Sequence, residues 1–264
     1  MSAFTEGTPC WADAALPDLA AGRRFYGELF GWTFEDQGED FAHYTIAFRD
    51  GKSAAALMTK PDPAIPTAWT IYFASTDATG AAARIGAAGG QVVFGPDKAG
   101  DVGVMLGAVD PGGSAFGVWQ AGDHAGFEIS DQPGSFCWTE NHTRETAAVD
   151  RFYETVFGYR AEQIGDGQHF DYKVWSPAAD PELQIGGRMK LGAGQPAGQR
   201  AAFRIYFAVD DCDAAVATVR ELGGKVADGP TDSPFGRLAT VADDQGAVFT
   251  VIDRTRREGA VDGS

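Results

Sequence analysis

The sequence predicts an α+β fold of two tandem domains, each built from two strand–helix–strand–strand–strand (βαβββ) units. The first observation behind this is a stretch that occurs twice: Cys10 to Trp32 (CWADAALPDLAAGRRFYGELFGW) returns as Cys137 to Tyr159 (CWTENHTRETAAVDRFYETVFGY). The second is that short strand-like runs and helix-like runs alternate in the same order within each half. A repeat of this length indicates a duplicated domain.

The repetition continues downstream and sets the domain limits. Ala68 to Phe73 (AWTIYF) matches Ala202 to Phe207 (AFRIYF), and the turn Asp110-x-x-Gly113 matches Asp243-x-x-Gly246. Glycine pairs and Gly-Pro pairs recur between these landmarks. We therefore expect a first domain at 1–122, a linker at 123–134, a second domain at 135–254 and a tail at 255–264. Each copy is large enough to form its own core.

The first unit begins with small and aromatic residues at 8–16, which predict a strand that stops at Pro17. Asp18 is placed to cap a helix, and apolar residues follow at three- and four-residue spacing until Gly31. Three short strands are expected at about 32–35, 42–48 and 53–58. The unit thus has the order strand, helix and three strands.

The second unit is expected at 68–120, with an Ala/Gly-rich helix that ends at Gly89-Gly90. The second domain repeats this plan, with clear apolar stripes in helices near 149–157 and 212–222. Between them, 176–200 is rich in Gly, Pro and Ala and is expected to be a long loop, either over a pocket or free on the surface.

Composition excludes several classes of partner. The chain has 264 residues, 44% hydrophobic and 22% charged, as in ordinary globular proteins, and its formal net charge is −16. Nucleic acid and anionic membrane bind positive faces, so neither is expected as a partner. No run approaches the length of a membrane-spanning helix, and no signal peptide is visible, so a cytoplasmic location is expected. Cys10 and Cys137 occupy matching positions and are expected to pack as small apolar residues.

The Phe-Tyr pairs near the first helix end of each domain and the two Asp-x-x-Gly turns resemble the vicinal-oxygen-chelate superfamily. This superfamily includes glyoxalase I, extradiol dioxygenases, fosfomycin-resistance transferases and bleomycin-resistance proteins. The chain is most similar to the two-domain actinobacterial glyoxalase-like proteins. The resemblance covers nearly the whole chain. It implies a tandem pair of glyoxalase-like domains whose strands curve into a cup, in which inward-facing side chains bind a divalent metal.

The ligand positions that this resemblance implies hold unsuitable residues. Each cup has three such positions. Two of them lie seven residues before the acidic residue that starts a helix, and the third lies four residues after the Gly of the Asp-x-x-Gly turn. In this chain they are Trp11, Thr70 and Gly117 in the first cup and Trp138, Arg204 and Thr250 in the second. Divalent metals need imidazole, carboxylate or thiolate ligands. We therefore expect no metal and no other cofactor, which argues against glyoxalase I and extradiol dioxygenase activity.

The histidines of the chain do not replace the missing metal ligands. They stand at 43, 124, 142 and 169, without the spacing of a metal site. Glu140 and His142 lie two residues apart on one strand face, which leaves a substitute metal site there as a minor alternative.

Strand alternation predicts what the cups contain instead, because every second residue points to the same face. The inward-facing residues are expected to be Trp11, Asp13, Thr70 and Tyr72 in the first cup and Trp138, Glu140, Arg204 and Tyr206 in the second. Aromatic walls with a few converging polar groups are typical of small-molecule sites.

Structural alternatives stay open for each of these residues. The tryptophans could be core residues, and the tyrosines could pack between domains. Glu140 and Arg204 could form a structural ion pair, and Asp13 could be exposed at the rim.

Two functions fit this content. The favoured one is a metal-free protein that binds or sequesters an aromatic or amphipathic metabolite or antibiotic, with Trp11, Thr70, Tyr72, Trp138, Arg204 and Tyr206 as ligand-binding residues. The alternative is a metal-independent lyase, isomerase or ring-modifying enzyme of secondary metabolism. It would use Glu140 or Asp13 as a general base whose pKa is raised by its aromatic surroundings, while Arg204 in the second cup would favour the ionised form.

A scaffolding role is a third possibility without specific support. The partner is expected to be a small molecule, and the protein either a monomer with paired domains or a homodimer.

Overall fold

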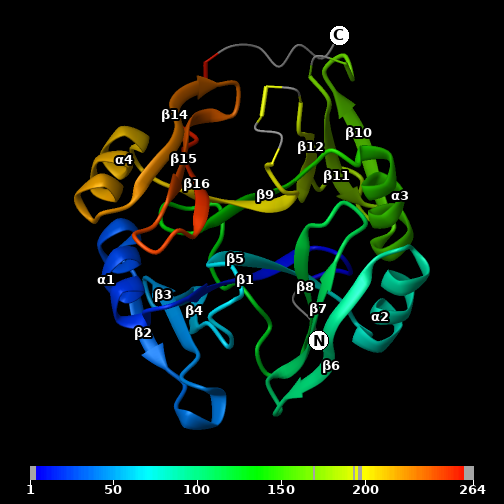
Figure 1. Ribbon diagram of the computed structural model, residues 1–264, viewed down its shortest axis with the longest axis horizontal. Coiled ribbons are helices and arrows are strands. Elements are labelled where there is room, and N and C mark those ends of the chain that lie inside the picture. Colours follow the sequence, from blue (N-terminus) through cyan, green and yellow to red (C-terminus); the bar gives the residue numbers. More distant parts are fainter. Residues whose placement is uncertain (1–3, 169, 193, 196–197, 259–264) are drawn as a thin grey trace.

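The computed structural model describes residues 4–168, 170–192, 194–195 and 198–258. It contains two eight-stranded sheets, each with two helices (Figure 1). The elements of the first domain are β1 (Pro9–Leu16), α1 (Leu19–Phe30), β2 (Thr33–Asp36), η1 (Glu39–Phe41), β3 (Thr45–Arg49), β4 (Lys52–Thr59), β5 (Ala68–Ala74), α2 (Ala78–Ala87), β6 (Gln91–Ala99), β7 (Gly103–Val109) and β8 (Ala115–Ala121).

The second domain repeats this order. Its elements are β9 (Phe136–Thr143), α3 (Thr146–Phe157), β10 (Tyr159–Ile164), β11 (Tyr172–Pro177), β12 (Gly186–Lys190), β13 (Ala202–Ala208), α4 (Cys212–Glu221), β14 (Lys225–Ser233), β15 (Gly236–Ala242) and β16 (Val248–Asp253). The tandem α+β architecture of paired βαβββ units is therefore confirmed.

The strand order shows how two units make one cup. The first sheet runs β2-β3-β4-β1-β5-β8-β7-β6, and the second repeats it as β10-β11-β12-β9-β13-β16-β15-β14. The two units of a domain meet where β1 pairs antiparallel with β5, and β9 with β13. Within each unit the first and last strands pair in parallel. The first strands of all four units thus lie in the middle of the sheets.

The helix boundaries follow the expected capping residues. Asp18 Oδ1 accepts a hydrogen bond from the Ala21 amide at 3.0 Å at the start of α1. Gly31 ends this helix at φ +68°, and Gly158 ends α3 at φ +70°. Left-handed backbone is accessible to glycine without a steric penalty, so both helices stop there.

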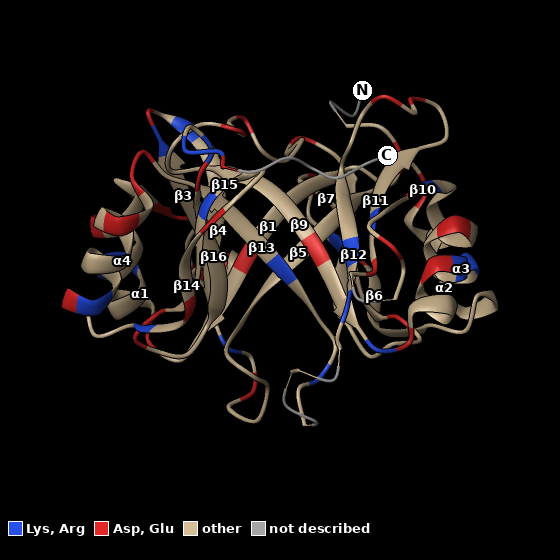
Figure 2. Cartoon of the chain, turned by 90° about the horizontal axis from the view of Figure 1, so that it is seen from above, with Lys and Arg blue, Asp and Glu red and all other residues tan. Residues whose placement is uncertain are grey.

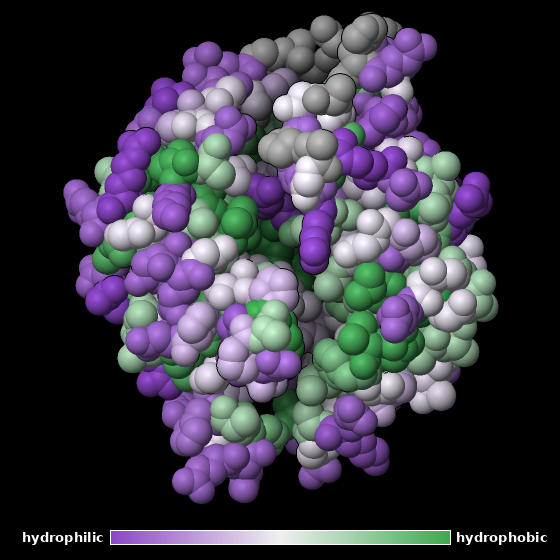
Figure 3. All heavy atoms as spheres, in the orientation of Figure 1, coloured by the Kyte–Doolittle hydropathy of each residue, from purple (hydrophilic) through white to green (hydrophobic). Residues whose placement is uncertain are grey.

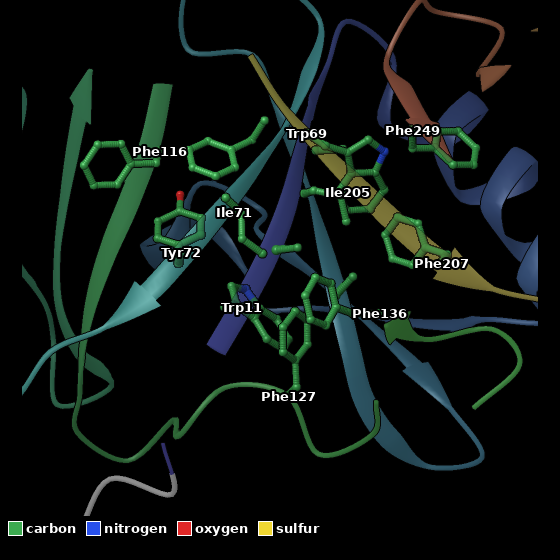
Figure 4. Packing of buried hydrophobic residues seen from close by; sticks show 14 of the residues in the cluster. Trp11, Trp69, Ile71, Tyr72, Phe116, Phe127, Phe136, Ile205, Phe207 and Phe249 are labelled. Atoms are coloured by element: carbon green, nitrogen blue, oxygen red, sulfur yellow. The ribbon is translucent and has the colours of Figure 1, made fainter. Parts of the chain in front are cut away.

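The helix-bearing faces of the two sheets pack against each other and form the shared core. Trp69 and Phe207 lie 5.0 Å apart between ring centroids, and Phe73 and Phe203 lie 5.5 Å apart. Figure 4 shows Trp69 beside Phe207 and Phe249, which come from the other domain. Helix α1 packs against α4, and α2 against α3, on the two sides of this core (Figure 1). The opposite face of each sheet is the cup face.

Two matching hydrogen bonds join the domains at the motifs that the sequence repeats. The Tyr26 hydroxyl donates to Asp243 Oδ2 at 2.8 Å, and the Tyr153 hydroxyl donates to Asp110 Oδ2 at 3.2 Å. Each bond links a Phe-Tyr pair of one domain to the Asp-x-x-Gly turn of the other. The domains of one chain therefore pair about a pseudo-twofold axis, with the duplicated motifs serving the contact between them.

The expectation of one long loop over 176–200 is wrong in its middle part, because β12 lies within it. This strand pairs with β11 and with β9. Its residue Arg188 is buried and bonds Asp150 at 3.1 Å and Asp171 at 2.6 Å. These ion pairs allow a glycine-rich stretch that contains an arginine to form a central strand. Residues 193, 196 and 197 of the expected loop lie outside the described residues.

The linker between the domains is hydrogen-bonded to two strands of the first sheet, β1 and β4. Its Phe127 amide donates to the Cys10 carbonyl at 2.8 Å, and its Glu128 amide donates to the Ser53 carbonyl at 2.9 Å. Strands β1 and β4 pair only from Asp13 and Ala56 onward. The linker therefore occupies the gap where these two strands diverge.

The two cysteines at matching positions are buried as expected, and each thiol lies 3.5 Å from a carbonyl of the neighbouring strand, Tyr72 for Cys10 and Tyr206 for Cys137. Figure 3 shows hydrophilic residues over much of this side, with hydrophobic residues exposed in its central recess. No helix among the described residues is long and apolar enough to cross a membrane.

Candidate functional site

The first cup holds a closed hydrogen-bonded cluster around one carboxylate. The hydroxyls of Tyr44 and Tyr72 both donate to Asp13 Oδ2, at 3.1 and 3.0 Å. The indole of Trp11 donates to the Tyr44 hydroxyl at 2.8 Å. Thr70 lies directly opposite Asp13 in the register of β1 and β5. The predicted convergence of Trp11, Asp13 and Tyr72 on one face is thus confirmed.

Asp13 is a buried acid and does not lie exposed at the rim, so that alternative is wrong. Only 3% of its surface is exposed. Burial raises the pKa of this carboxyl to about 6, while the hydrogen bonds from Tyr72 and Tyr44 limit the rise. A carboxyl with this pKa can hold or release a proton near neutrality.

The linker covers the first cup on its tryptophan side. The ring of His124 meets Trp11 edge-on at 4.5 Å, and Phe127 lies 5.5 Å from Trp11. Phe127 also stacks on Phe136, the first residue of β9, as Figure 4 shows. Trp11 is consequently only 4% exposed. A ligand could reach this indole only if the linker moved away.

The second cup repeats the cluster with other residues. The indole of Trp138 donates to the Tyr172 hydroxyl at 2.9 Å, as Trp11 does to Tyr44. The Tyr206 hydroxyl donates to Glu140 Oε2 at 2.6 Å, and His142 Nε2 lies 3.1 Å from the same oxygen. Each cup thus contains an indole, two phenols and a carboxylate, and the second adds an imidazole.

Glu140 differs from Asp13 in the direction of its pKa shift. Burial alone would raise the pKa of Glu140, but the hydrogen bond and charge of His142, with hydrogen bonds from Tyr206 and Tyr172, outweigh it and lower the pKa. The expectation of a raised carboxylate pKa therefore holds for Asp13 and is wrong for Glu140. Glu140 remains ionised at neutral pH and is a poor general base.

Arg204 does not pair with Glu140, so the expected structural ion pair is wrong. The two residues are direct neighbours across the paired strands β9 and β13, which Figure 2 shows side by side. However, Tyr206 and His142 already bind the carboxylate, and the Arg204 guanidinium turns to Thr240, with Nη1 3.0 Å from Oγ1. Among the described residues, no carboxylate lies within ion-pair distance of Arg204.

The second cup is the more accessible of the two. Trp138, Arg204 and Tyr206 are all partly exposed, whereas Trp11 and Tyr72 are buried. No aromatic ring within the described part of the chain packs on Trp138 as His124 and Phe127 pack on Trp11. The first cup is therefore a filled structural cluster, whereas the aromatic and basic groups of the second cup are partly exposed.

The residues at the implied metal positions do not fit a divalent cation. Trp11, Thr70 and Gly117 offer one neutral hydroxyl, and Trp138 and Thr250 stand beside the positive guanidinium of Arg204. The described residues contain no group of three histidine, cysteine, aspartate or glutamate side chains able to hold a metal. Glu140 and His142 bind each other instead. No reaction step through a metal is derived for this donor set.

The sequence analysis missed Tyr44 and Tyr172, which complete the clusters. Both lie near the start of the third strand of their unit and occupy matching positions in the repeat. This match between the two copies could have identified them from the sequence. It also missed the linker residues His124 and Phe127, for which no periodicity gave a signal. Of the other histidines, His43 contacts Asp36 at 3.0 Å, and His169 lies outside the described residues.

Comparisons with known proteins agree with this architecture. The model of the glyoxalase/bleomycin resistance protein/dioxygenase superfamily matches residues 11–118, and a glyoxalase-like domain model matches residues 138–252. Among solved structures, the Mn(II)-bound glyoxalase from Novosphingobium aromaticivorans superposes with a TM-score of 0.64 at 15% identity, covering 97% of this chain and 87% of that one. At this identity the likeness shows the fold alone.

Several relatives match along their whole length. The anthracycline biosynthesis protein DnrV of Streptomyces peucetius is 35% identical, over 98% of this chain and 97% of its own. CFP32 of Mycobacterium tuberculosis is 35% identical, over 95% of this chain and 96% of its own. With both domains matched and relatives of this similarity, the chain belongs to the glyoxalase/bleomycin resistance protein/dioxygenase superfamily.

Proposed function

We propose that the protein binds a planar aromatic metabolite in its second cup without a resident metal. The observation that carries this proposal is the partly exposed set of Trp138, Tyr206 and Arg204 on the cup face. A tryptophan and a tyrosine held in fixed orientations provide a stacking surface that loses little conformational entropy when a ligand binds. Trp138 is held by Tyr172 and Tyr206 by Glu140, so both rings are fixed before binding.

The relatives support the ligand class. DnrV and DauV are both named for anthracycline biosynthesis. Anthracyclines contain a fused planar ring system, which is the shape that an indole and a phenol can stack against. We infer that the ligand of this chain belongs to a similar class of fused-ring aromatic metabolite.

Catalysis at Asp13 is the second candidate, because its pKa near 6 suits proton transfer. The burial of Asp13 and the covering linker argue against direct contact with a substrate. Glu140 is also buried, and its lowered pKa makes it a weak base. Binding is therefore the function that the geometry favours.

Native mass spectrometry of the protein purified from its own cells identifies the ligand, and titration of variants then tests the role of the cup. Trp138→Ala should weaken binding by about 2 kcal/mol through loss of an aromatic anchor. Glu140→Gln should change affinity by no more than about 1 kcal/mol. Thr70→Ala, in the covered cup, is the matched control and should leave affinity unchanged.

Product analysis on the same variants separates binding from catalysis. If the protein only binds, the ligand is recovered unchanged from the wild-type protein. Conversion that falls roughly 100-fold in Glu140→Gln while binding persists would establish catalysis and refute the proposal. The expected cytoplasmic location stays a prediction; the three cysteines, all free and buried, agree with it.

A further inference from the structure

The guanidinium of Arg204 is a cation inside the second cup without an anionic partner. Strand alternation places Arg204 and Tyr206 on the cup face of β13, because Phe203 and Phe207 on the other face contact the first domain. One hydrogen bond anchors the group, from Nη1 to the Thr240 hydroxyl at 3.0 Å. Thr240 in turn lies 3.5 Å from Thr250, oxygen to oxygen.

Two acids lie near this charge, but neither forms an ion pair with Arg204. Glu140 is the direct cross-strand neighbour, but its Oε2 atom is bound by Tyr206 and His142. Glu140 and Asp228, which lies on β14, both act on Arg204 through their charges, Glu140 more strongly than Asp228. No ion pair joins Arg204 to any carboxylate within the described ranges of the chain. A partly buried cation without a partner is costly unless a ligand brings the opposite charge.

The first cup provides an internal comparison. Its position equivalent to Arg204 is Thr70, a neutral residue opposite Asp13. The duplicated scaffold therefore does not need a basic residue at this place. The cation is present only in the second cup, whose indole, Trp138, is partly exposed.

We propose that Arg204 binds a carboxylate carried by the planar aromatic ligand of the second cup. This inference rests on the proposed function and specifies its ligand class as aromatic carboxylates. A guanidinium presents parallel N–H donors that match the two oxygens of a carboxylate, and the bond to Thr240 leaves most of these donors free. The rings stack on Trp138 while the acid group faces β13.

The test uses 2-naphthoate and its neutral isostere 2-naphthamide as probes, measured by isothermal titration calorimetry at constant ionic strength. Wild-type protein should bind 2-naphthoate at least about tenfold more tightly than 2-naphthamide, as expected for charge-assisted hydrogen bonds. Arg204→Thr, which installs the residue of the first cup, should abolish this preference. Arg204→Lys should retain part of it, because the charge remains and the paired donors are lost.

Two further variants keep the outcomes distinct. Arg160→Thr removes the same charge from an exposed edge strand and should leave the preference intact. Trp138→Ala should weaken both probes in parallel.

Each outcome decides one claim. Equal binding of both probes by the wild type, sensitive to Trp138→Ala, would overturn the carboxylate inference and leave the proposed function standing. Binding of neither probe would contradict both. A preference for 2-naphthoate that depends on Arg204, with the affinities for both probes unchanged by Trp138→Ala, would support the anion site and refute stacking.

Discussion

The substitution Asp13→Asn should stabilise the protein at neutral pH, because it removes a charge that the fold buries. The pKa of Asp13 rises from its ordinary 3.8 to about 6 in the folded protein. A tenfold change in a protonation equilibrium is worth about 1.4 kcal/mol, so ionising this group in the folded state costs about 3 kcal/mol. Asparagine is uncharged and keeps an oxygen that can accept from both Tyr44 and Tyr72.

The sign of the pH dependence follows from linkage. Below the unfolded pKa the acid is protonated in both states and contributes no penalty. As pH rises from about 4 through 6, the unfolded chain releases its proton first, and the folded state becomes progressively less favoured. Wild type should lose stability over this window, and Asp13→Asn should not. The difference should grow from near zero at about pH 4 to as much as about 3 kcal/mol at about pH 7.

Urea unfolding at a series of pH values measures this difference, because other titrating groups are common to both proteins. Glu140→Gln, at the matching position of the second cup, is the control, and we expect it to change the stability in the opposite direction. Its carboxylate has a lowered pKa, so it contributes stability above its unfolded pKa that is lost as pH falls through the folded value. Glu140→Gln should therefore destabilise at neutral pH. If both variants shifted stability in the same direction at all pH values, the assignment of opposite pKa shifts to Asp13 and Glu140 would be wrong.

Other consequences follow for the domain contact, the second domain and metal content. Tyr26→Phe leaves Asp243 Oδ2 without its donor and should lower the free energy of unfolding by about 1–3 kcal/mol in urea titration; an unchanged midpoint would refute a role in domain pairing. Arg188→Ala leaves the carboxylates of Asp150 and Asp171 without their buried partner and should cost about 3–5 kcal/mol. A loss below 1 kcal/mol would show that this network is not structural. Elemental analysis should find no stoichiometric transition metal, and a chelator should leave Tm unchanged; about one metal ion per domain would contradict the account of both cups.

Much of the fold was predictable because the sequence contains two copies of one domain that can be compared with each other. The repeated Cys-Trp, Phe-Tyr and Asp-x-x-Gly landmarks set the order of elements. Strand alternation then placed Trp11, Asp13 and Tyr72 on one face without any structural information. Where the local pattern changed, the prediction failed: β12 was missed because its glycines indicate a loop, and burial of Arg188 depends on acids far along the chain.

The interactions within each cup were less predictable, because they depend on side-chain orientation. Glu140 and Arg204 are direct neighbours across two strands, and proximity alone favoured an ion pair. In the structure Glu140 binds Tyr206 and His142 instead, and the Arg204 guanidinium bonds Thr240 and forms no ion pair with Glu140. The covering of Trp11 by Phe127 was equally hidden, because a linker without periodicity shows no preferred face. Accessibility of the two cups therefore became visible only in three dimensions.

A crystal structure of the protein with 2-naphthoate tests the central claim most directly. We predict electron density in the second cup, with the rings against Trp138 and the carboxylate within hydrogen-bond distance of Arg204. The first cup should retain the linker over Trp11 and contain no ligand. Density for the probe in the first cup alone, or in the second cup with its carboxylate away from Arg204, would contradict the account.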